Sequence, residues 1–266
     1  MALDGSVMSA SAQLAGGGRM PLLGFGTWRL SGEECRTAVG WALEAGYRHL
    51  DTATMYGNER EVGQALADSG VPRDEVFVTT KLPPDRAGRE LETLRESVDA
   101  LGTGAVDLWL VHWPPPDGSL VDVWRAVVRA REEGLAEAVG VSNFSLEQVD
   151  ELTRATGVTP VVDQVRWSPS LHDPAFLTGC RERGVVLEGY SPFKASDLED
   201  PVLADVARRH GAEPTQVVVR WHLQHGVVVI PKSARRERIL GNADVAGFEL
   251  TADDMAALDG LGGGGA

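Results

Sequence analysis

Short apolar runs alternate with longer stretches of helical period along this chain of 266 residues. The apolar runs are rich in β-branched residues, which predicts buried strands. We place these strands at residues 48–51, 76–81, 106–112, 137–142, 161–165, 185–190 and 227–231, after a first strand that runs to about residue 28. The stretches between them predict helices that end at or near glycine, for example 32–46, 89–102, 120–134, 145–157, 204–211 and 215–226.

The order of these elements indicates the fold class. Strands that alternate with helices favour an α/β protein, a (β/α)8 TIM barrel, over a doubly wound sheet. The segment "GFGTW" has two glycines and lacks the rest of a dinucleotide-binding G-x-G-x-x-G, so it does not support the doubly wound alternative. We expect a single domain over residues 1–266, with a short N-terminal β-hairpin and flexible tails at about 1–11 and 262–266.

The composition limits the partners and the location of the protein. A formal net charge of −14 argues against nucleic acid or an anionic membrane as a partner. No apolar run is long enough to span a membrane, and the N-terminus lacks the basic and apolar regions of a signal peptide. Cys35 and Cys180 stand alone, without C-x-x-C spacing, as in proteins of the reducing cytoplasm. We therefore expect a cytoplasmic protein with a small-molecule ligand.

Polar residues recur at the ends of successive predicted strands. They are Asp51, Lys81, His112 and Asn143, separated by 30, 31 and 31 residues, and Gln164 and Tyr190 continue the series. In a barrel, the carboxyl ends of the strands converge on one face, where active sites lie. Each residue alone has an ordinary structural explanation, such as a cap, a solvated lysine or a core histidine. Their common position in the repeat favours a shared site.

Carbonyl reduction is the chemistry that suits these side chains. An alkoxide that forms at the carbonyl oxygen must be protonated, and Tyr56 is the candidate acid. A free phenol has a pKa of about 10, and a nearby Lys81 would make it more acidic. Asp51 would hold Lys81 in place, and His112 would donate a hydrogen bond to the carbonyl oxygen and orient it.

A series of motifs connects the chain to a known family. From about residue 20 to residue 258 it contains "LGFGTW", "GYRHLDTATMYGNE", "VTTKL", "DLWLVHWP", "GVSNFS", "DQVRWSP", "GYSP" and "VVVIPKSARRERILGN", in that order. The chain resembles the aldo-keto reductases, and most closely the bacterial diketogluconate-reductase-like branch. The resemblance implies an enzyme, usually monomeric, that reduces aldehydes or ketones to alcohols with NADPH. It also implies the catalytic tetrad Asp51, Tyr56, Lys81 and His112.

The same resemblance implies roles for residues that would bind the cofactor and the substrate. The positions that match the family's nicotinamide, ribose and pyrophosphate contacts are Ser142, Asn143, Gln164 and Tyr190, then Thr27 and Asp51, then Ser191 and Phe193. Those that match the contacts of the adenosine 2′-phosphate and the adenine are Lys232, Ser233, Arg238 and Asn242. The positions that match the substrate pocket are Trp28, Met55 and Trp113.

The segment "KSARRER", residues 232–238, is basic in an otherwise acidic chain. It could be a solvated helix face, but it follows the last strand, where barrels often bind phosphate. Arginine is suited to gripping a phosphate, so we expect NADPH rather than NADH. The chain departs from the family at Gly241, where relatives often have a glutamate, and at residues 166–169, where Glu-x-His-Pro is commoner. These departures affect the outer rim of the expected cofactor site.

Two alternatives to a reductase follow from the residues. His222 and His225 are spaced i, i+3 on a predicted helix, as in half of a metal site, but the sequence indicates no third ligand, and we expect no metal. The chain could also be a non-catalytic NADPH-binding regulatory subunit, but its complete tetrad favours an enzyme. The physiological substrate stays open. The short "HWPPPDG" loop, the Gly-rich end and the missing tryptophan after "KL" predict an open pocket for several small carbonyl compounds.

Overall fold

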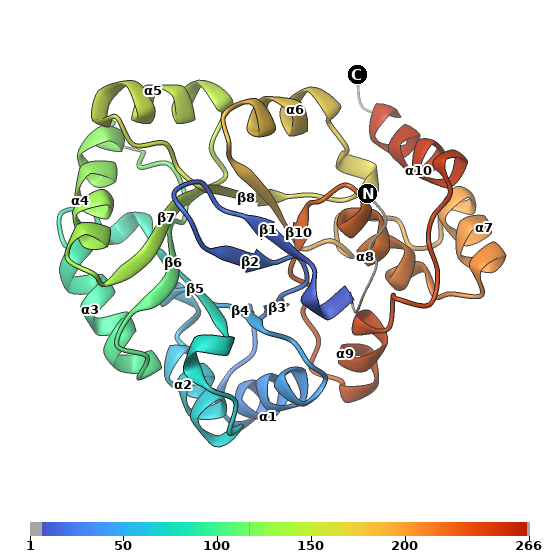
Figure 1. Ribbon diagram of the computed structural model, residues 1–266, viewed down its shortest axis with the longest axis horizontal. Helices are drawn as coiled ribbons and strands as arrows, with labels where there is room; N and C mark the ends of the chain where they lie inside the picture. Colours follow the sequence, from blue (N-terminus) through green and yellow to red (C-terminus); the bar gives the residue numbers. More distant parts are fainter. Residues whose placement is uncertain (1–6, 117, 265–266) are drawn as a thin grey trace.

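The computed structural model describes residues 7–116 and 118–264, and a barrel of parallel strands forms its centre (Figure 1). The strands are β3 (Phe25–Gly26), β4 (His49–Asp51), β5 (Phe77–Leu82), β6 (Val106–Val111), β7 (Ala136–Ser142), β8 (Val162–Arg166), β9 (Val186–Tyr190) and β10 (Val228–Val229). Each strand pairs in parallel with the next along the chain, and a parallel bridge between Leu23 and Val229 joins the segment just before β3 to β10. The (β/α)8 fold predicted from the sequence is confirmed.

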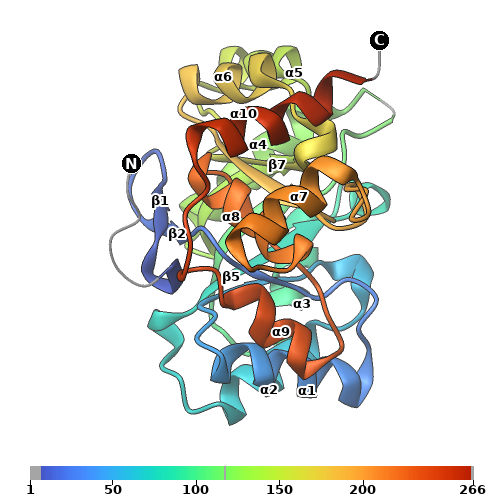
Figure 2. The same ribbon diagram turned by 90° about the vertical axis from the view of Figure 1, so that its right-hand side faces the viewer.

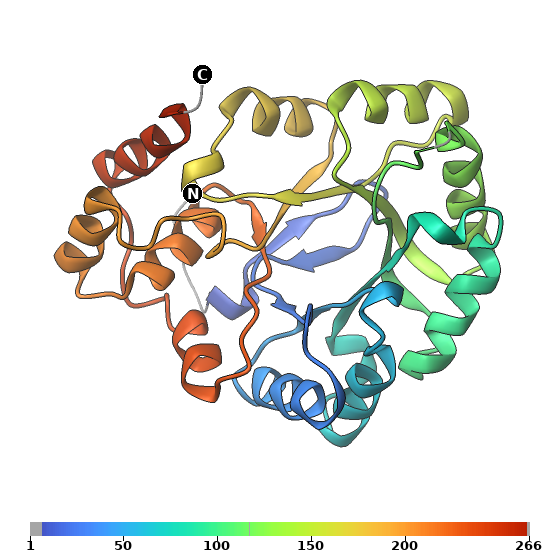
Figure 3. The same cartoon turned by 180° about the vertical axis from the view of Figure 1, so that it is seen from behind.

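Helices surround this barrel, as Figures 1 and 3 show from its two ends. They are α1 (Gly32–Glu44), α2 (Glu59–Asp68), α3 (Glu90–Leu101), α4 (Leu120–Glu132), α5 (Leu146–Thr156), α6 (Pro174–Glu182), α7 (Pro201–His210), α8 (Pro214–Gln224), α9 (Arg236–Ala243) and α10 (Ala252–Asp259). Helix α7 begins three residues earlier than predicted, because the Asp200 side chain caps it and Pro201 occupies its first turn. In the described ranges, no helix has the length and apolar character needed to cross a membrane.

The N-terminal hairpin lies across the end of the barrel where the strands begin (Figures 1 and 2). It consists of β1 (Ser11–Gln13) and β2 (Arg19–Pro21), which pair antiparallel, as predicted. Both predicted tails contain regular structure. Val7–Ser9 form a short 3-10 helix with Val7 buried, and a 3-10 helix covers Gly260–Gly264. Residues 1–6 and 265–266 of those tails lie outside the described residues.

The first barrel strand is shorter than the sequence suggested. It ends at Gly26 rather than near Trp28, because the chain turns there. The amide of Leu30 donates to the carbonyl oxygen of Thr27, and Arg29 has a left-handed φ of 66°. The turn directs the Trp28 side chain toward the face of the barrel where the strands end.

Strand β5 shows how the two-residue period of a strand places polar groups in the barrel. All six of its residues are buried. Successive side chains alternate between the interior of the barrel and the surrounding helices. Thr80 faces outward and its hydroxyl donates to Glu59 of α2, whereas Thr79 contacts His49 in the interior. Lys81 therefore points inward, although neither neighbour in the sequence does.

Candidate active site

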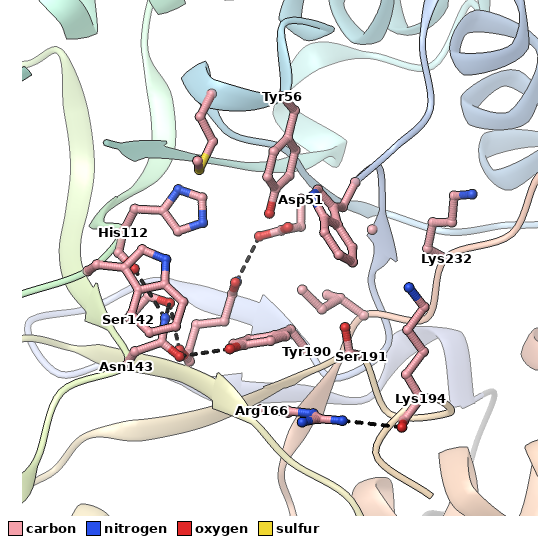
Figure 4. A pocket seen from close by; sticks show the side chains of 16 residues that line it. Asp51, Tyr56, His112, Ser142, Asn143, Arg166, Tyr190, Ser191, Lys194 and Lys232 are labelled. Carbon is pink, nitrogen blue, oxygen red and sulfur yellow. Dashed lines mark hydrogen bonds between the residues drawn. The ribbon is translucent and has the colours of Figure 1, made fainter. Parts of the chain in front are cut away.

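A cavity of about 450 Å³ opens where the barrel strands end (Figure 4). Its walls include these predicted residues: Trp28, Asp51, Met55, Tyr56, His112, Trp113, Ser142, Asn143, Gln164, Tyr190, Ser191 and Lys232. Gly26, Arg166, Lys194 and Ile230 complete the walls. Lys81 lies behind this surface and is fully buried. The structure thus brings together residues that are spread over most of the chain.

Lys81 forms the centre of a buried polar cluster. Its Nζ lies 2.7 Å from Oδ1 of Asp51 and 3.5 Å from the hydroxyl of Tyr56, and it donates to the carbonyl oxygen of Thr52 at 2.8 Å. The amide of Gln164 donates to the other carboxylate oxygen of Asp51 at 2.8 Å. The ammonium therefore has three oxygen acceptors around it, one of which is the phenol that faces the cavity.

The segment after β4 holds Tyr56 in this position. Thr54–Tyr56 form one turn of 3-10 helix, and the Thr54 hydroxyl donates to the carbonyl oxygen of Lys81 at 3.0 Å. The buried Asn58 side chain donates to the carbonyl oxygens of Thr27 and Leu30, at 3.0 and 2.9 Å. These contacts tie the loop to two neighbouring barrel segments. The phenol is thus fixed beside Lys81 rather than being free to rotate into solvent.

The environment of the cavity gives Tyr56 and His112 different protonation behaviour. Burial raises the pKa of Tyr56, and the charge of Lys81 offsets only part of that rise. The expectation of a net more acidic phenol is therefore not met in this structure. Burial, assisted by Lys81, lowers the pKa of His112 to about 3. Near neutral pH, Tyr56 carries its proton and His112 is an uncharged imidazole.

A buried carboxyl group, Glu188, lies in the same region of the barrel and was missed in the sequence. Its side chain is fully buried, and neither of its oxygens has a hydrogen-bond partner among the described residues. Burial, with a further contribution from Asp51, raises the pKa of Glu188 to about 8. The group is therefore mainly protonated at neutral pH. A signal was available: Glu188 is two residues before Tyr190 on β9 and so points to the same side of the strand.

Tyr190 presents a half-buried ring in the cavity, beside the side chain of Asn143 (Figure 4). Its hydroxyl donates to Oδ1 of Asn143 at 2.9 Å, and the Asn143 amide donates to the carbonyl oxygen of His112 at 3.2 Å. Asn143 and Ser191 both have left-handed φ values, 64° and 53°. Such conformations are uncommon outside glycine and are often found at functional sites.

A second cavity, of about 470 Å³, adjoins the first, and Lys232 lines both. The predicted residues in its wall are Phe193, Lys232, Ser233, Arg238 and Asn242. Neither Lys232 nor Arg238 forms an ion pair with another described residue, so their charges are available to a ligand. Arg235 and Arg236 do not line the cavity, and Arg236 lies 3.6 Å from Glu44 instead. Two cations of the basic segment, Lys232 and Arg238, thus line the cavity, whereas Arg235 and Arg236 lie outside it.

Thr27 lies outside both cavities, unlike the other residues predicted to bind the cofactor. Its side chain is fully buried, and its hydroxyl donates to the backbone carbonyl oxygen of Asp51 at 2.9 Å. This hydrogen bond links the end of β3 to β4. The oxygen of this hydroxyl could still accept a hydrogen bond, but a direct contact with a ribose would require the buried side chain to become accessible.

The histidine pair considered in the sequence does not form one site. Both ring nitrogens of His222 face backbone carbonyl oxygens, of Val218 at 2.7 Å and of Trp167 at 3.4 Å. His225 instead contacts Asp259, 34 residues further along the chain. The expectation that no third ligand is available overlooked this contact, because residues so far apart in sequence give no spacing signal.

Comparisons with known proteins agree with this geometry. The model of the aldo/keto reductase family matches residues 22–262. An aldo-keto reductase from Mycolicibacterium vanbaalenii is 46% identical over 246 residues, which is 91% of this chain and 88% of that protein. The crystal structure of an aldo/keto reductase from Brucella melitensis matches with a TM-score of 0.91 and 39% identity, over 95% of this chain and 99% of that one. That of a Bombyx mori aldo-keto reductase in complex with NADP matches with a TM-score of 0.87 and 34% identity, over 95% and 92%. This chain belongs to the aldo/keto reductase family.

Proposed function

We propose that this protein reduces small aldehydes and ketones to alcohols with NADPH, and that Tyr56 is the proton donor. Membership of the family supports the reaction class, and the Bombyx mori relative with bound NADP supports the cofactor. The order of the sequence motifs supports the finer proposal of a monomeric enzyme of the diketogluconate-reductase-like branch.

The two adjoining cavities suit the two ends of a dinucleotide. The Tyr190 ring offers a flat surface for a nicotinamide, and Asn143 and Gln164 offer amides to its carboxamide group. Lys232 and Arg238, which have no ion-pair partner among the described residues, offer their charges to a phosphate on the adenosine, with Ser233 beside them. Cationic side chains form strong hydrogen bonds with phosphate oxygens, and arginine can form two at once. The residues present therefore fit NADPH.

The choice of Tyr56 rather than His112 as the acid rests on one observation. Near neutral pH, the Tyr56 phenol is protonated, whereas the His112 imidazole has already lost its acidic proton. A bound reduced nicotinamide would supply the two electrons of the reduction. The carbonyl oxygen then takes a proton from a nearby acid. With a pKa of about 3, His112 has no proton to give as an acid near neutral pH, although its N–H can still donate a hydrogen bond. Tyr56 retains its proton and lies in the cavity wall.

Lys81 makes the loss of that proton easier. Burial disfavours the phenolate that remains on Tyr56, and a cation 3.5 Å from its oxygen stabilises it. Burial alone would lower the pKa of Lys81, but Asp51, Tyr56 and Glu188 outweigh burial and hold it above the usual value. Lys81 therefore stays charged throughout the reaction. Asp51 acts on the phenol indirectly, by keeping that charge in place.

The test is the consumption of NADPH in the presence of a simple aldehyde, for the wild type and for Tyr56→Phe. The loss of a positioned acid should reduce turnover by about 10²–10⁴-fold, with little change in NADPH affinity. Tyr47→Phe is a matched control: the ring of this buried tyrosine packs against Phe25, its hydroxyl donates to the carbonyl oxygen of Ile239, and it lines neither cavity. Turnover near the wild-type value in Tyr56→Phe would refute the assignment. A wild type that binds NADPH but reduces no carbonyl compound would favour the regulatory-subunit alternative.

A further inference from the structure

Three potential metal ligands converge outside both cavities. His172 follows a short 3-10 helix, Pro169–Leu171, in the β8–α6 loop, His225 ends α8, and Asp259 ends α10. The 3-10 helix lies beside α10 in Figure 1. One ligand atom from each residue lies within 4.8 Å of the other two. His172 and His225 are 53 positions apart in the sequence, and His225 and Asp259 are 34 apart. No motif spacing therefore indicated this cluster.

The distances from Asp259 to the two histidines are close to those of a metal site. Nε2 of His225 lies 2.8 Å, and Nδ1 of His172 lies 3.6 Å, from the same oxygen of Asp259. Zinc binds nitrogen and oxygen at about 2.0–2.2 Å, so ligand atoms around it lie about 3.2–3.6 Å apart. The contact with His172 already has this spacing. The contact with His225 must lengthen by a few tenths of an ångström, as an ion replaces the hydrogen bond.

The surroundings of the cluster favour ligation. The indole N–H of Trp221 donates to Oδ1 of Asp259 at 2.8 Å, which fixes the carboxylate as outer partners do in known sites. The Asp259 side chain is 30% exposed, which leaves a path from solvent. The guanidinium of Arg181, bound to the carbonyl oxygen of His225, is the unfavourable charge nearby.

We propose that His172, His225 and Asp259 bind a divalent transition-metal ion such as Zn²⁺, at a site separate from the reductase cavities. Two imidazole nitrogens and one carboxylate oxygen are a common donor set for this ion, with water as a fourth ligand. The three ligands come from the β8–α6 loop, α8 and α10. The bound ion therefore links α10 to the β8–α6 loop and to α8. Because unfolding separates these segments, binding stabilises the folded protein.

The experiment uses protein without a histidine tag, stripped with a chelator and titrated with Co²⁺, whose visible absorption reports nitrogen and oxygen ligation. We expect one Co²⁺ per chain with a micromolar or lower Kd, displacement by Zn²⁺, and a higher Tm with either ion. His172→Gln should weaken binding by at least about 10–100-fold, as the loss of supporting groups does in other sites. His210→Gln is the matched control, because His210 pairs with Asp254 at 2.8 Å in a different cluster.

Asp259→Asn provides a second variant should His172→Gln fail to fold. Its amide oxygen can still accept from Trp221, while the charge needed for the ion is lost. It should therefore fold, lack the Co²⁺ absorption and show no rise in Tm with metal. Millimolar binding in the wild type, or micromolar binding unchanged in both variants, would overturn the proposal. Turnover should be the same with and without the ion, which separates this test from that of the reductase function.

Discussion

Lys81 donates a hydrogen bond to Asp51 across 2.7 Å, and both side chains are almost completely excluded from solvent. A buried ion pair contributes little net stability compared with apolar residues, because both charges lose their hydration. Removal of one partner leaves the other charge buried and unpaired, which is costly. This pair also maintains the charge next to Tyr56. Substitutions can therefore separate the contribution of this pair to protein stability from its contribution to the reaction.

Lys81→Met should reduce turnover to a level near that of Tyr56→Phe, because the phenolate loses its stabilising cation. It should also lower the free energy of unfolding by about 3–5 kcal/mol, since the buried Asp51 loses the cation that pairs with its charge. Urea denaturation and steady-state kinetics measure the two effects. The double variant Lys81→Met/Asp51→Asn should regain much of the stability and none of the activity. Recovery of activity in the double variant would show that Lys81 does not assist Tyr56.

Arg238→Ala should weaken the binding of NADPH more than that of NADH, because only NADPH carries the adenosine 2′-phosphate. The loss of a charge-assisted contact, about 1.5–3 kcal/mol, corresponds to about 10–150-fold in Kd. Fluorescence titration with both cofactors measures the difference. Arg236→Ala serves as the control, since this arginine lies outside the cavity and near Glu44. Equal losses for the two cofactors would mean that Arg238 does not contact that phosphate.

Glu188→Gln should change how stability depends on pH. The pKa of Glu188 is about 8 in the folded protein and near its ordinary value of 4.5 when unfolded, so the folded state holds an extra proton between these pH values. Glu188 therefore makes the wild type lose stability as pH rises through this window, and its own contribution is up to about 1.4 kcal/mol per pH unit. The amide of the variant has no such proton to lose.

The measurement for this variant is urea denaturation at a series of pH values between 4.5 and 8.5, compared with the wild type. The free energy of unfolding of the variant should fall less steeply with rising pH than that of the wild type, but it should still fall. Burial also raises the pKa of Asp163 to about 8, and that carboxyl keeps its own contribution. Identical slopes for the two proteins would indicate that Glu188 is already ionised at the low end of the window.

The enzyme should accept several small aldehydes, α-keto esters or dicarbonyls, each with modest affinity. Trp28, Met55 and Trp113 line the cavity and are still 43%, 58% and 45% exposed, so the apolar wall encloses a substrate only partly. Few enclosing contacts leave few differences in binding energy between one carbonyl compound and another. Values of kcat/KM for about a dozen compounds test this expectation. A preference of more than about a thousandfold for one of them would contradict it.

The barrel and the main site residues could be predicted from the sequence because they follow from local periodicity. Apolar runs separated by helical stretches specify strands and helices, and parallel strands in chain order place their carboxyl ends together. The recurrence of Asp51, Lys81 and His112 about every 30 residues then implies a common face. The first strand was less predictable. Its end is set by a turn at Arg29, whose left-handed conformation the sequence does not indicate.

The sequence by itself thus determined the order of the elements and which polar residues meet. The tertiary structure alone decided the properties that depend on distance and solvent. Burial made Glu188 a protonated acid, lowered the pKa of His112 to about 3 and outweighed the effect of Lys81 on Tyr56. Packing of α10 against α7 and against the 3-10 helix Pro169–Leu171 brought Asp259 to His225. Periodicity is a property of neighbouring residues, whereas desolvation and long-range contacts arise only when distant segments exclude water together.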